Sequence, residues 1–405
     1  MIKKRFKVAV AVLGMSAMIC GCNSVSSDTA SDSSSEVETK DVESSESADS
    51  TDPIAVAGIV PLTGDMAQYG EAFQSAFEDC IAEYNEAGGW NGREIELELY
   101  DDKGDPKETV NIGNKILAED KYISVLGPFS STCGLALAEV LDEEEMFTFA
   151  PVISHPDFVD TNEYTLSYSH KSKLEGIFSA RYLKEWGGSK VAGIYSNNDF
   201  GVTLSDAFAA ESEAQGMEVV ASEPFIVGQT KDFSSILTKI RNAGADSLYL
   251  MGQYNEIGQI LLQINDMGWD DVNVLACSST FMQETLDIAS EGAEGVRWAT
   301  AFTPENPNED FQAYRANFQE KYGKDIDLFY AYGYDTCRIF LDGLDKSENP
   351  EGKEILSNIL EIRDFDILSG KCFFEETRDI TRGFFIAEPN AEGAYEIIDA
   401  PDIMD

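Results

Sequence analysis

Between residues 53 and 300, short apolar segments alternate along the chain with longer segments of helical periodicity. Residues 53–60 are almost continuously apolar, as is typical of a strand that a parallel sheet buries on both faces. Apolar side chains then recur at helical spacing from Phe73 to Tyr84, and this segment ends at Gly88 and Gly89. Strands that alternate with helices of this length predict an α/β fold built on a doubly wound parallel sheet.

The alternation falls into two parts, which predict two lobes. The first part continues with strands at 95–99 and 122–126 and a helix at 106–119. The pattern restarts at Leu174, with strands expected at 191–195, 218–221, 246–251 and 273–276. After Thr300 the pattern changes again, with helices expected at 308–322, 328–346 and 353–361. Two such lobes, joined by several crossings of the chain, predict a cleft that closes about a hinge.

These changes of pattern also predict the domain boundaries. We expect residues 53–170 and 301–382 to form an N-terminal lobe, and residues 171–300 and 383–400 to form a C-terminal lobe. The hinge would then have three crossings, near residues 168–173, 298–303 and 380–384.

The first 52 residues indicate export and a tether. A basic start precedes an apolar run at 8–19 that is too short for a membrane span, and the run closes on Ile19-Cys20-Gly21-Cys22, which resembles a bacterial lipobox. We expect residues 1–22 to be a lipoprotein signal peptide with lipidation at Cys22; an ordinary secretory signal is the alternative. Residues 23–52, rich in Ser, Asp and Glu, predict a disordered tether. The protein would be extracytoplasmic and lipid-anchored to the cell membrane.

Charge and missing motifs exclude several classes of function. The formal net charge of −45 argues against binding to nucleic acid. The chain has two histidines, and it shows no nucleophile elbow, zinc-protease motif or phosphate loop. The five cysteines of the expected lobes show no metal-ligand spacing. We therefore predict no enzymatic activity, no cofactor and no metal.

The stretch from Leu126 to Ser154 is a candidate binding wall. Ser130, Ser131 and Thr132 follow a strand and a Gly-Pro turn, and they precede a helix-like run. Hydroxyl residues at a helix start can cap its free amides, or they can offer N–H and hydroxyl groups to an anion. Because ligands sit at the carboxyl ends of strands in α/β sheets, the stretch predicts one wall of a cleft for a small carboxylate. The alternative is that the serines only cap their helix.

The sequence resembles a known family over nearly all of residues 53–400. The matching motifs are PLTGDMAQYG at 61–70, NEAGGWNGREIELELYDDKGDP at 85–106, GPFSS at 127–131, FAPVIS at 149–154, NDFG at 198–201, KDFSSILTKIRNAGAD at 231–246, GQYNEIGQIL at 252–261 and AYGYD at 331–335. In this order they resemble the leucine/isoleucine/valine-binding proteins, which have the type I periplasmic binding (Venus flytrap) fold and serve ABC importers. The resemblance implies a monomer that captures an amino acid or related small carboxylate by lobe closure and delivers it to membrane permease subunits.

The resemblance also implies a set of ligand-binding residues. A carboxylate is held in the family by hydroxyls that match Ser131 and Ser154, beside Ser130, and the carbonyl of Val152 would face an ammonium group. The other implied lining residues are Tyr69, Phe200, Tyr254, Ser278 and Tyr334. The three tyrosines can alternatively be ordinary core aromatics.

One position departs from the family pattern. In leucine-type members a carboxylate that aligns with Ser278 meets the ammonium group of the ligand, whereas the stretch LACSSTFMQ at 275–283 has no acid. A buried ammonium without a counter-charge costs several kcal/mol. Either Glu256 or Asp199 takes this role, or the ligand is not a free α-amino acid. Relatives also bind aliphatic amides, urea, short-chain acids and aromatic acids.

Two other functions stay open at this level. One is a ligand-sensing receptor lobe for amides, urea or aromatic acids that takes no part in transport. The other is an adhesion or structural lipoprotein that binds no solute.

Overall fold

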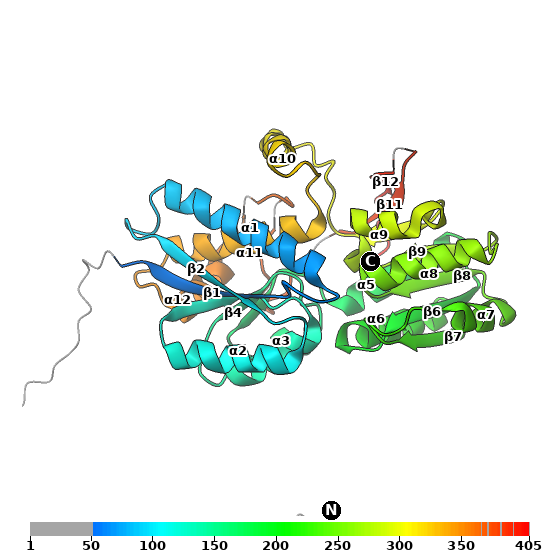
Figure 1. The fold of residues 1–405 in the computed structure, drawn as a ribbon, viewed down its shortest axis with the longest axis horizontal. Helices are drawn as coiled ribbons and strands as arrows, with labels where there is room; N and C mark the ends of the chain where they lie inside the picture. Colours follow the sequence, from blue (N-terminus) through cyan, green and yellow to red (C-terminus); the bar gives the residue numbers. More distant parts are fainter. Residues whose placement is uncertain (1–51, 366, 371, 381–382, 392, 405) are drawn as a thin grey trace, which may run out of the picture. The chain divides into compact units, whose positions relative to one another are not determined.

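The computed structural model describes residues 52–404 apart from 366, 371, 381–382 and 392. The expected signal peptide, the lipidation site Cys22 and the tether up to residue 51 lie outside the described residues. Among the described residues, no helix is both long and apolar enough to cross a bilayer. The described chain forms two sheets with helices packed on them (Figure 1), so the predicted two-lobe α/β fold is confirmed.

The first lobe is built on a five-stranded sheet with the order β2-β1-β3-β4-β5, in which all neighbours are parallel. Its strands are β1 (Ile54–Val60), β2 (Ile95–Asp101), β3 (Tyr122–Leu126), β4 (Thr148–Ala150) and β5 (Thr165–Ser167). Its helices are α1 (Ala67–Glu86), α2 (Pro106–Glu119), α3 (Ser131–Leu141), α4 (Asp157–Asp160), α10 (Glu309–Tyr322), α11 (Leu328–Asp345) and α12 (Gly352–Glu361). Figure 1 shows α2 and α3 on one side of the sheet and α1 with α11 on the other.

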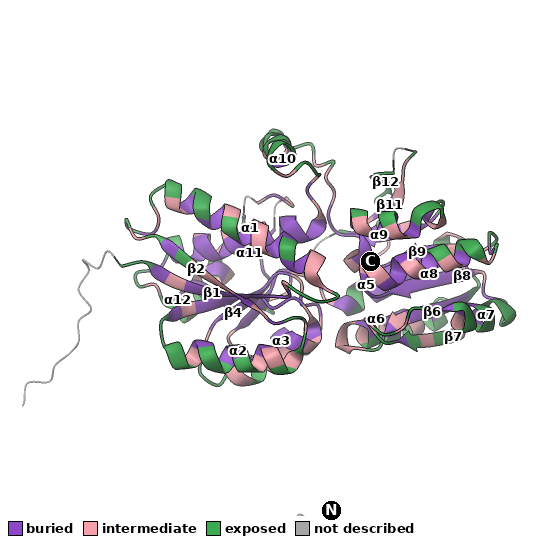
Figure 2. Ribbon diagram, in the orientation of Figure 1, coloured by how far each residue is buried: buried purple, intermediate pink, exposed green. Residues whose placement is uncertain are grey.

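Local signals explain where these helices begin. Asp105 caps α2, because its carboxylate accepts from the N–H groups of Lys107 (2.8 Å) and Glu108 (3.1 Å), and Pro106 occupies the first helical position. The two sides of each helix differ as well, since buried faces meet the sheet and exposed faces meet solvent in Figure 2. The segments predicted from periodicity therefore form the layers expected of a doubly wound lobe.

Helix α11 packs along α1 in the same direction, although most of the second lobe, from α5 to β10, separates the two in sequence. Phe329 meets Tyr69 at one end, with ring centroids 4.6 Å apart, and Gly333 meets Ala76 further along. A Cβ atom on Gly333 would lie only 2.9 Å from the Cβ atom of Ala76. Glycine at this position therefore lets α1 and α11 pack closely together over one face of the first sheet.

The second lobe is built on a seven-stranded sheet with the order β12-β11-β10-β9-β8-β6-β7. Its strands are β6 (Lys190–Ser196), β7 (Glu218–Phe225), β8 (Ser247–Met251), β9 (Asn273–Ala276), β10 (Arg297–Thr300), β11 (Phe385–Pro389) and β12 (Tyr395–Asp399). Its helices are α5 (Ser172–Glu185), α6 (Asp199–Ala214), α7 (Ser234–Asn242), α8 (Tyr254–Asp266) and α9 (Gln283–Ala289), with short 3₁₀ turns η1 (Ser278–Thr280) and η2 (Ser290–Ala293). Helices α5 and α6 share one apolar cluster, whereas α7 and α8 contribute to another.

One edge of this second, mainly parallel sheet is antiparallel. Strand β11 runs antiparallel to both β10 and β12. For the β11–β12 pair the reason is the short connection, where the Asn390 N–H donates to the Ala394 carbonyl (2.7 Å). So short a connection joins antiparallel strands only, because parallel neighbours need a long crossover.

The chain passes between the two sheets three times: after β5, after β10 and before β11. The first and third passages touch, since the rings of His170 and Phe384 lie 4.6 Å apart at an interplanar angle of 74°. Residues 381–382, in the expected third crossing, lie outside the described part of the chain.

Candidate functional site

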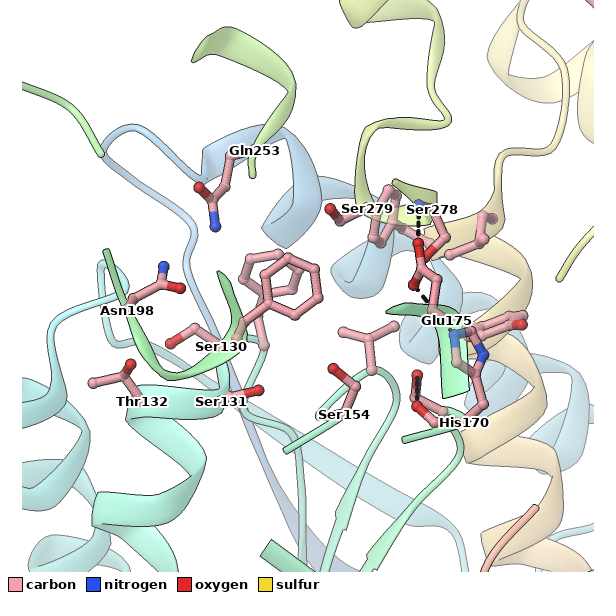
Figure 3. Close-up of a pocket in the computed structure, with 17 residues that line it drawn as sticks. Ser130, Ser131, Thr132, Ser154, His170, Glu175, Asn198, Gln253, Ser278 and Ser279 are labelled. Carbon is pink, nitrogen blue, oxygen red and sulfur yellow. Dashed lines mark hydrogen bonds and ion pairs between the residues drawn. The ribbon is translucent and has the colours of Figure 1, made fainter. Parts of the chain in front are cut away.

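A pocket lies where the strand ends of both lobes meet (Figure 3). Its first-lobe residues follow β3, β4 and β5 or lie on α11, and its second-lobe residues follow β6, β8 and β9 or lie on α5. The carboxyl ends of strands are the usual ligand site of α/β sheets. The pocket leaves about 60 Å³ open to the centres of water molecules. That space suits a small organic molecule.

The first-lobe wall begins with a sharp turn after β3. Gly127 has a φ of +114°, and a Cβ atom there would lie 2.1 Å from the carbonyl oxygen of Ile59. The turn brings Ser130 to the start of α3, where its Oγ accepts from the Cys133 N–H (3.2 Å). Ser130 therefore acts as a helix cap, as the alternative interpretation had it, although it also lines the pocket.

Ser131 and Ser154 present the free polar groups of this wall. Both are buried and both line the pocket. Ser154 is 5% exposed, and its Oγ has no hydrogen-bond partner among the described residues; in Figure 3 its hydroxyl points into the pocket. The first N–H groups of α3 have no partner within the helix, and they carry the positive end of its dipole. This wall can therefore hold an anion by amides and hydroxyls.

The second-lobe wall contains Asn198, Phe200, Gln253, Ser278 and Ser279. Asn198 caps α6 by accepting from the Gly201 N–H (2.9 Å). Ser279 Oγ donates to the Gly252 carbonyl (2.6 Å). Gln253 differs from these, because it is 5% exposed and its Oε1 has no partner among the described residues.

A buried carboxylate, Glu175 on α5, closes one end of the pocket. It is 1% exposed and lines the pocket together with His170 and Ser278. Its Oε1 accepts from the Ser278 N–H (2.7 Å) and the Tyr249 hydroxyl (3.2 Å). Its Oε2 accepts from the Ser278 hydroxyl (2.8 Å) and lies 3.3 Å from His170 Nε2. Glu175 thus holds Ser278 and His170 in place.

Neither acid that was considered from the sequence lines the pocket. Glu256 accepts from the Gly228 N–H (3.0 Å) and lies 3.9 Å from Lys231 Nζ; burial raises the pKa of its carboxyl. Asp199 accepts from the Thr132 hydroxyl (2.6 Å). The carboxylate that does line the pocket, Glu175, was missed. No local motif marks Glu175, because its position depends on the packing of α5 against the second sheet.

Tyr69 and Tyr254 lie behind the pocket and are not among its lining residues. Tyr69 is fully buried and stacks on Phe129, with ring centroids 4.4 Å apart. Its hydroxyl donates to the Ser279 carbonyl (3.0 Å) and accepts from the Tyr254 N–H (2.9 Å). Burial raises the pKa of the Tyr69 hydroxyl well above its ordinary value. Tyr69 therefore joins the lobes and supports the lining ring of Phe129.

Tyr334, which the resemblance places among the ligand-binding residues, lies away from the pocket lining. Tyr334 is not a lining residue, and its hydroxyl donates to Glu83 on the far side of α1 (2.5 Å). The residues of α11 that do line the pocket are Leu328, Phe329 and Tyr332. With 3.6 residues per turn, Tyr332 and Tyr334 point about 200° apart around the helix. Two tyrosines so close in sequence cannot be assigned to the correct face without the packing.

The remaining expected residues, Val152, Phe200 and Ser278, line the pocket together with Ser130, Ser131 and Ser154. Among the described residues, no group of three or more histidine, cysteine or acidic side chains is placed to hold a metal ion. Five cysteines in this part of the chain are free thiols, and all of them are buried.

A pocket between two α/β lobes, lined by hydroxyls and by aromatic rings, is the arrangement found in solute-binding proteins of the two-lobe type. Residues 53–394 match the family described as periplasmic binding protein, and the chain belongs to this family. It is therefore a binding protein and not an enzyme.

Individual relatives agree with this assignment. The Leu/Ile/Val-binding protein BraC3 of Rhizobium johnstonii is 27% identical over 339 residues, which are 82% of this chain and 90% of that protein. The crystal structure of a leucine-binding protein, LivK, from Thermotoga maritima matches with a TM-score of 0.80 at 22% identity, over 86% of this chain and 99% of that one. A solute-binding protein of an ABC transporter from Rhodopseudomonas palustris, in complex with 3,4-dihydroxybenzoic acid, matches with a TM-score of 0.79 at 20% identity, over 87% and 97% of the two chains.

Proposed function

We propose that this chain is the extracytoplasmic, lipid-anchored solute-binding protein of an ABC importer and that it captures a small carboxylate. The observation that carries the proposal is the buried hydroxyl of Ser154, which lies without a partner among the described residues in a pocket that also contains Ser131 at the start of α3. Such a wall suits a carboxylate, since the helix amides and hydroxyls donate and no lining acid on that side repels the anion. The names of the relatives, which include amino-acid binders and a transporter subunit for an aromatic acid, support the same class.

Lobe closure would couple binding to delivery. Hydrogen bonds already join the lobes beside the pocket, from the Thr132 hydroxyl to Asp199 and from the Tyr69 hydroxyl to the Ser279 carbonyl. A solute that touches both walls adds contacts that exist only when the lobes are closed, so it shifts the population towards the closed form. The closed form would then dock on permease subunits. The hinge at the three crossings and the domain boundaries given above are part of this proposal.

The roles of the pocket residues follow from their positions. Ser131 and Ser154, with the first amides of α3, would hold the carboxylate, while Ser130 shapes the helix start. Val152, Phe200 and Ser278 would contact the rest of the solute. Anchoring through Cys22 rests on the sequence alone.

Calorimetry on the mature chain against leucine, isoleucine, benzoate and 4-hydroxybenzoate tests the class of ligand. We expect a Kd in the micromolar range or below for at least one of these carboxylates. Absence of heat and of thermal stabilisation with all of them would contradict the proposal.

A double variant tests the carboxylate site. Ser131→Ala with Ser154→Ala should weaken binding by at least about 100-fold, because hydrogen bonds to a charged group contribute about 1.5–3 kcal/mol each. Ser212→Ala is the matched control, since Ser212 on α6 is also a buried serine whose Oγ lacks a partner among the described residues and it lies outside the pocket. Equal affinities in the double variant and the control would remove the assignment.

A further inference from the structure

We propose that the solute is a carboxylate that carries no ammonium group and whose second polar group is a neutral donor, a hydroxyl or an amide N–H. This inference rests on the proposed function and names the class of solute for the same pocket. It runs against the free branched-chain amino acids that the names of the relatives suggest.

The hydrogen-bonding capacity of the Glu175 carboxylate is already used within the protein. A carboxylate has about four lone-pair positions for hydrogen bonds. Three are taken by donors of the protein, two from Ser278 and one from the Tyr249 hydroxyl, and His170 fills the fourth in the tautomer that carries a proton on Nε2, 3.3 Å from Oε2. An ammonium group could bond to Glu175 only by displacing a donor that would itself be left buried and unpaired. Glu175 is therefore not a free counter-charge for a solute.

The other residues that line the pocket offer no counter-charge to an ammonium group. Apart from Glu175 and His170, the lining residues given by the described part of the chain are all uncharged. Asp199 and Glu256 are turned to other partners, Thr132 and the Gly228 N–H. An ammonium group in this pocket would thus find only neutral oxygens free to accept its hydrogen bonds, because the one lining carboxylate, Glu175, is bonded within the protein. Burial of a charge without a bonded counter-charge is unfavourable, whereas a neutral donor carries no such penalty.

On the second-lobe side, opposite Ser131 and Ser154, the pocket offers an amide oxygen. Gln253, at the end of β8, is buried, and its Oε1 has no partner among the described residues. Figure 3 shows its side chain extending towards the pocket from the second lobe. An amide oxygen accepts from a hydroxyl or an amide N–H without a change of charge. Around it, Phe129, Phe200 and Phe329 supply aromatic surface for an apolar or aromatic body.

The test compares solutes that differ in a single group. Calorimetry on the mature chain would measure leucine against 2-hydroxy-4-methylpentanoate, in which a hydroxyl replaces the ammonium group, and benzoate against 4-hydroxybenzoate. We expect the hydroxy acid to bind at least tenfold more tightly than leucine. Leucine binding as tightly as the hydroxy acid or more tightly would overturn the inference and leave the proposed function standing. Absence of binding by all four solutes would overturn both.

Variants of Gln253 test the residue itself. Gln253→Leu should reduce the advantage of the hydroxylated solute over its partner by about tenfold, whereas Gln259→Leu on α8, the helix that begins after Gln253, should leave it unchanged, since Gln259 bonds to Asn255 and lies outside the pocket. Gln253→Glu supplies the missing counter-charge, so it should raise the affinity for leucine relative to the hydroxy acid. The role of Gln253 would be refuted if wild type, Gln253→Leu and Gln253→Glu all melt normally and show the same preference for the hydroxy acid over leucine.

Discussion

The two walls of the pocket differ in how their polar groups are used. On the first-lobe wall, the hydroxyl of Ser154 lies without a partner among the described residues, and the opening amides of α3 lie beside it. On the second-lobe wall, Glu175, Ser279 and Asn198 are already bonded within the protein. The first-lobe wall therefore offers groups that can bind an anion, whereas the polar groups of the second-lobe wall, apart from Gln253, are bonded within the protein and stabilise it.

Because of this difference, substitutions on the two walls should change different quantities, the free energy of unfolding for one wall and the affinity for the solute for the other. Groups that are bonded internally stabilise the fold, and their loss should appear in the free energy of unfolding. Groups without a partner in the solute-free protein form hydrogen bonds only with a bound solute, so their loss should raise the dissociation constant. The variants below test this division, starting with the largest expected effect.

Glu175→Gln should destabilise the protein by about 3 kcal/mol, because the amide NH₂ that replaces one oxygen would face donors of Ser278 or His170. Urea unfolding of the solute-free chain measures this. Glu185→Gln at the exposed end of the same helix is the control and should change the free energy of unfolding by less than about 0.5 kcal/mol. Similar values for the two variants would show that the second-lobe wall does not depend on Glu175.

Tyr69→Phe should cost about 1–2 kcal/mol, since it leaves the Ser279 carbonyl and the Tyr254 N–H without their shared partner. Because these bonds join the lobes, part of the cost should appear as weaker solute binding. Thermal melting with and without solute separates the two contributions. A normal melting temperature together with normal affinity would show that this junction is not needed.

Thr132→Val should have a smaller effect, about 1 kcal/mol, by removing the hydroxyl that donates to Asp199 across the lobes. We expect affinity to fall by about fivefold and the solute-free protein to become more open in small-angle scattering. Serine at the same position keeps the hydroxyl and should restore both properties. If the valine and serine variants behave alike, the bond does not hold the lobes.

Tyr334→Phe should change affinity by less than about 0.5 kcal/mol, the smallest effect of the series. The Tyr334 hydroxyl bonds to Glu83 on the outer side of α1, away from the pocket. Tyr332→Phe, on the lining face of α11, is the informative neighbour. A loss of affinity in Tyr334→Phe that exceeds the loss in Tyr332→Phe would contradict the assigned helix faces.

Much of the fold could be predicted because its signals are local. Asp105 and Pro106 fix the start of α2, and the apolar run at 273–276 is a strand with those bounds. The antiparallel edge at β11 was not predicted, because pairing direction depends on which neighbours the sheet selects. The structure also brings Ser131, Val152, Ser154, Phe200 and Ser278 to one pocket, where their contacts with a solute stay a prediction.

The rest of the site could not be predicted because it depends on contacts between distant segments. Glu175 reaches Ser278 and Tyr249 only after α5 has packed on the second sheet. Tyr69 and Tyr334 were placed in the pocket from their motifs, yet Phe129 covers the first and the helix turns the second away. A motif identifies the neighbourhood of a residue, but the direction of its side chain is decided by tertiary packing.

The pairing of α1 with α11 also has a consequence for biosynthesis. When α1 leaves the ribosome, the helix that covers Tyr69, Phe73 and Ala76 is not yet made, and it follows only after every strand up to β10. The nascent first lobe must therefore keep an apolar surface uncovered for most of its synthesis, a condition that favours aggregation. For the export that is part of the proposed function, such a delay is an advantage, because a chain that cannot complete its tertiary structure early remains competent for translocation.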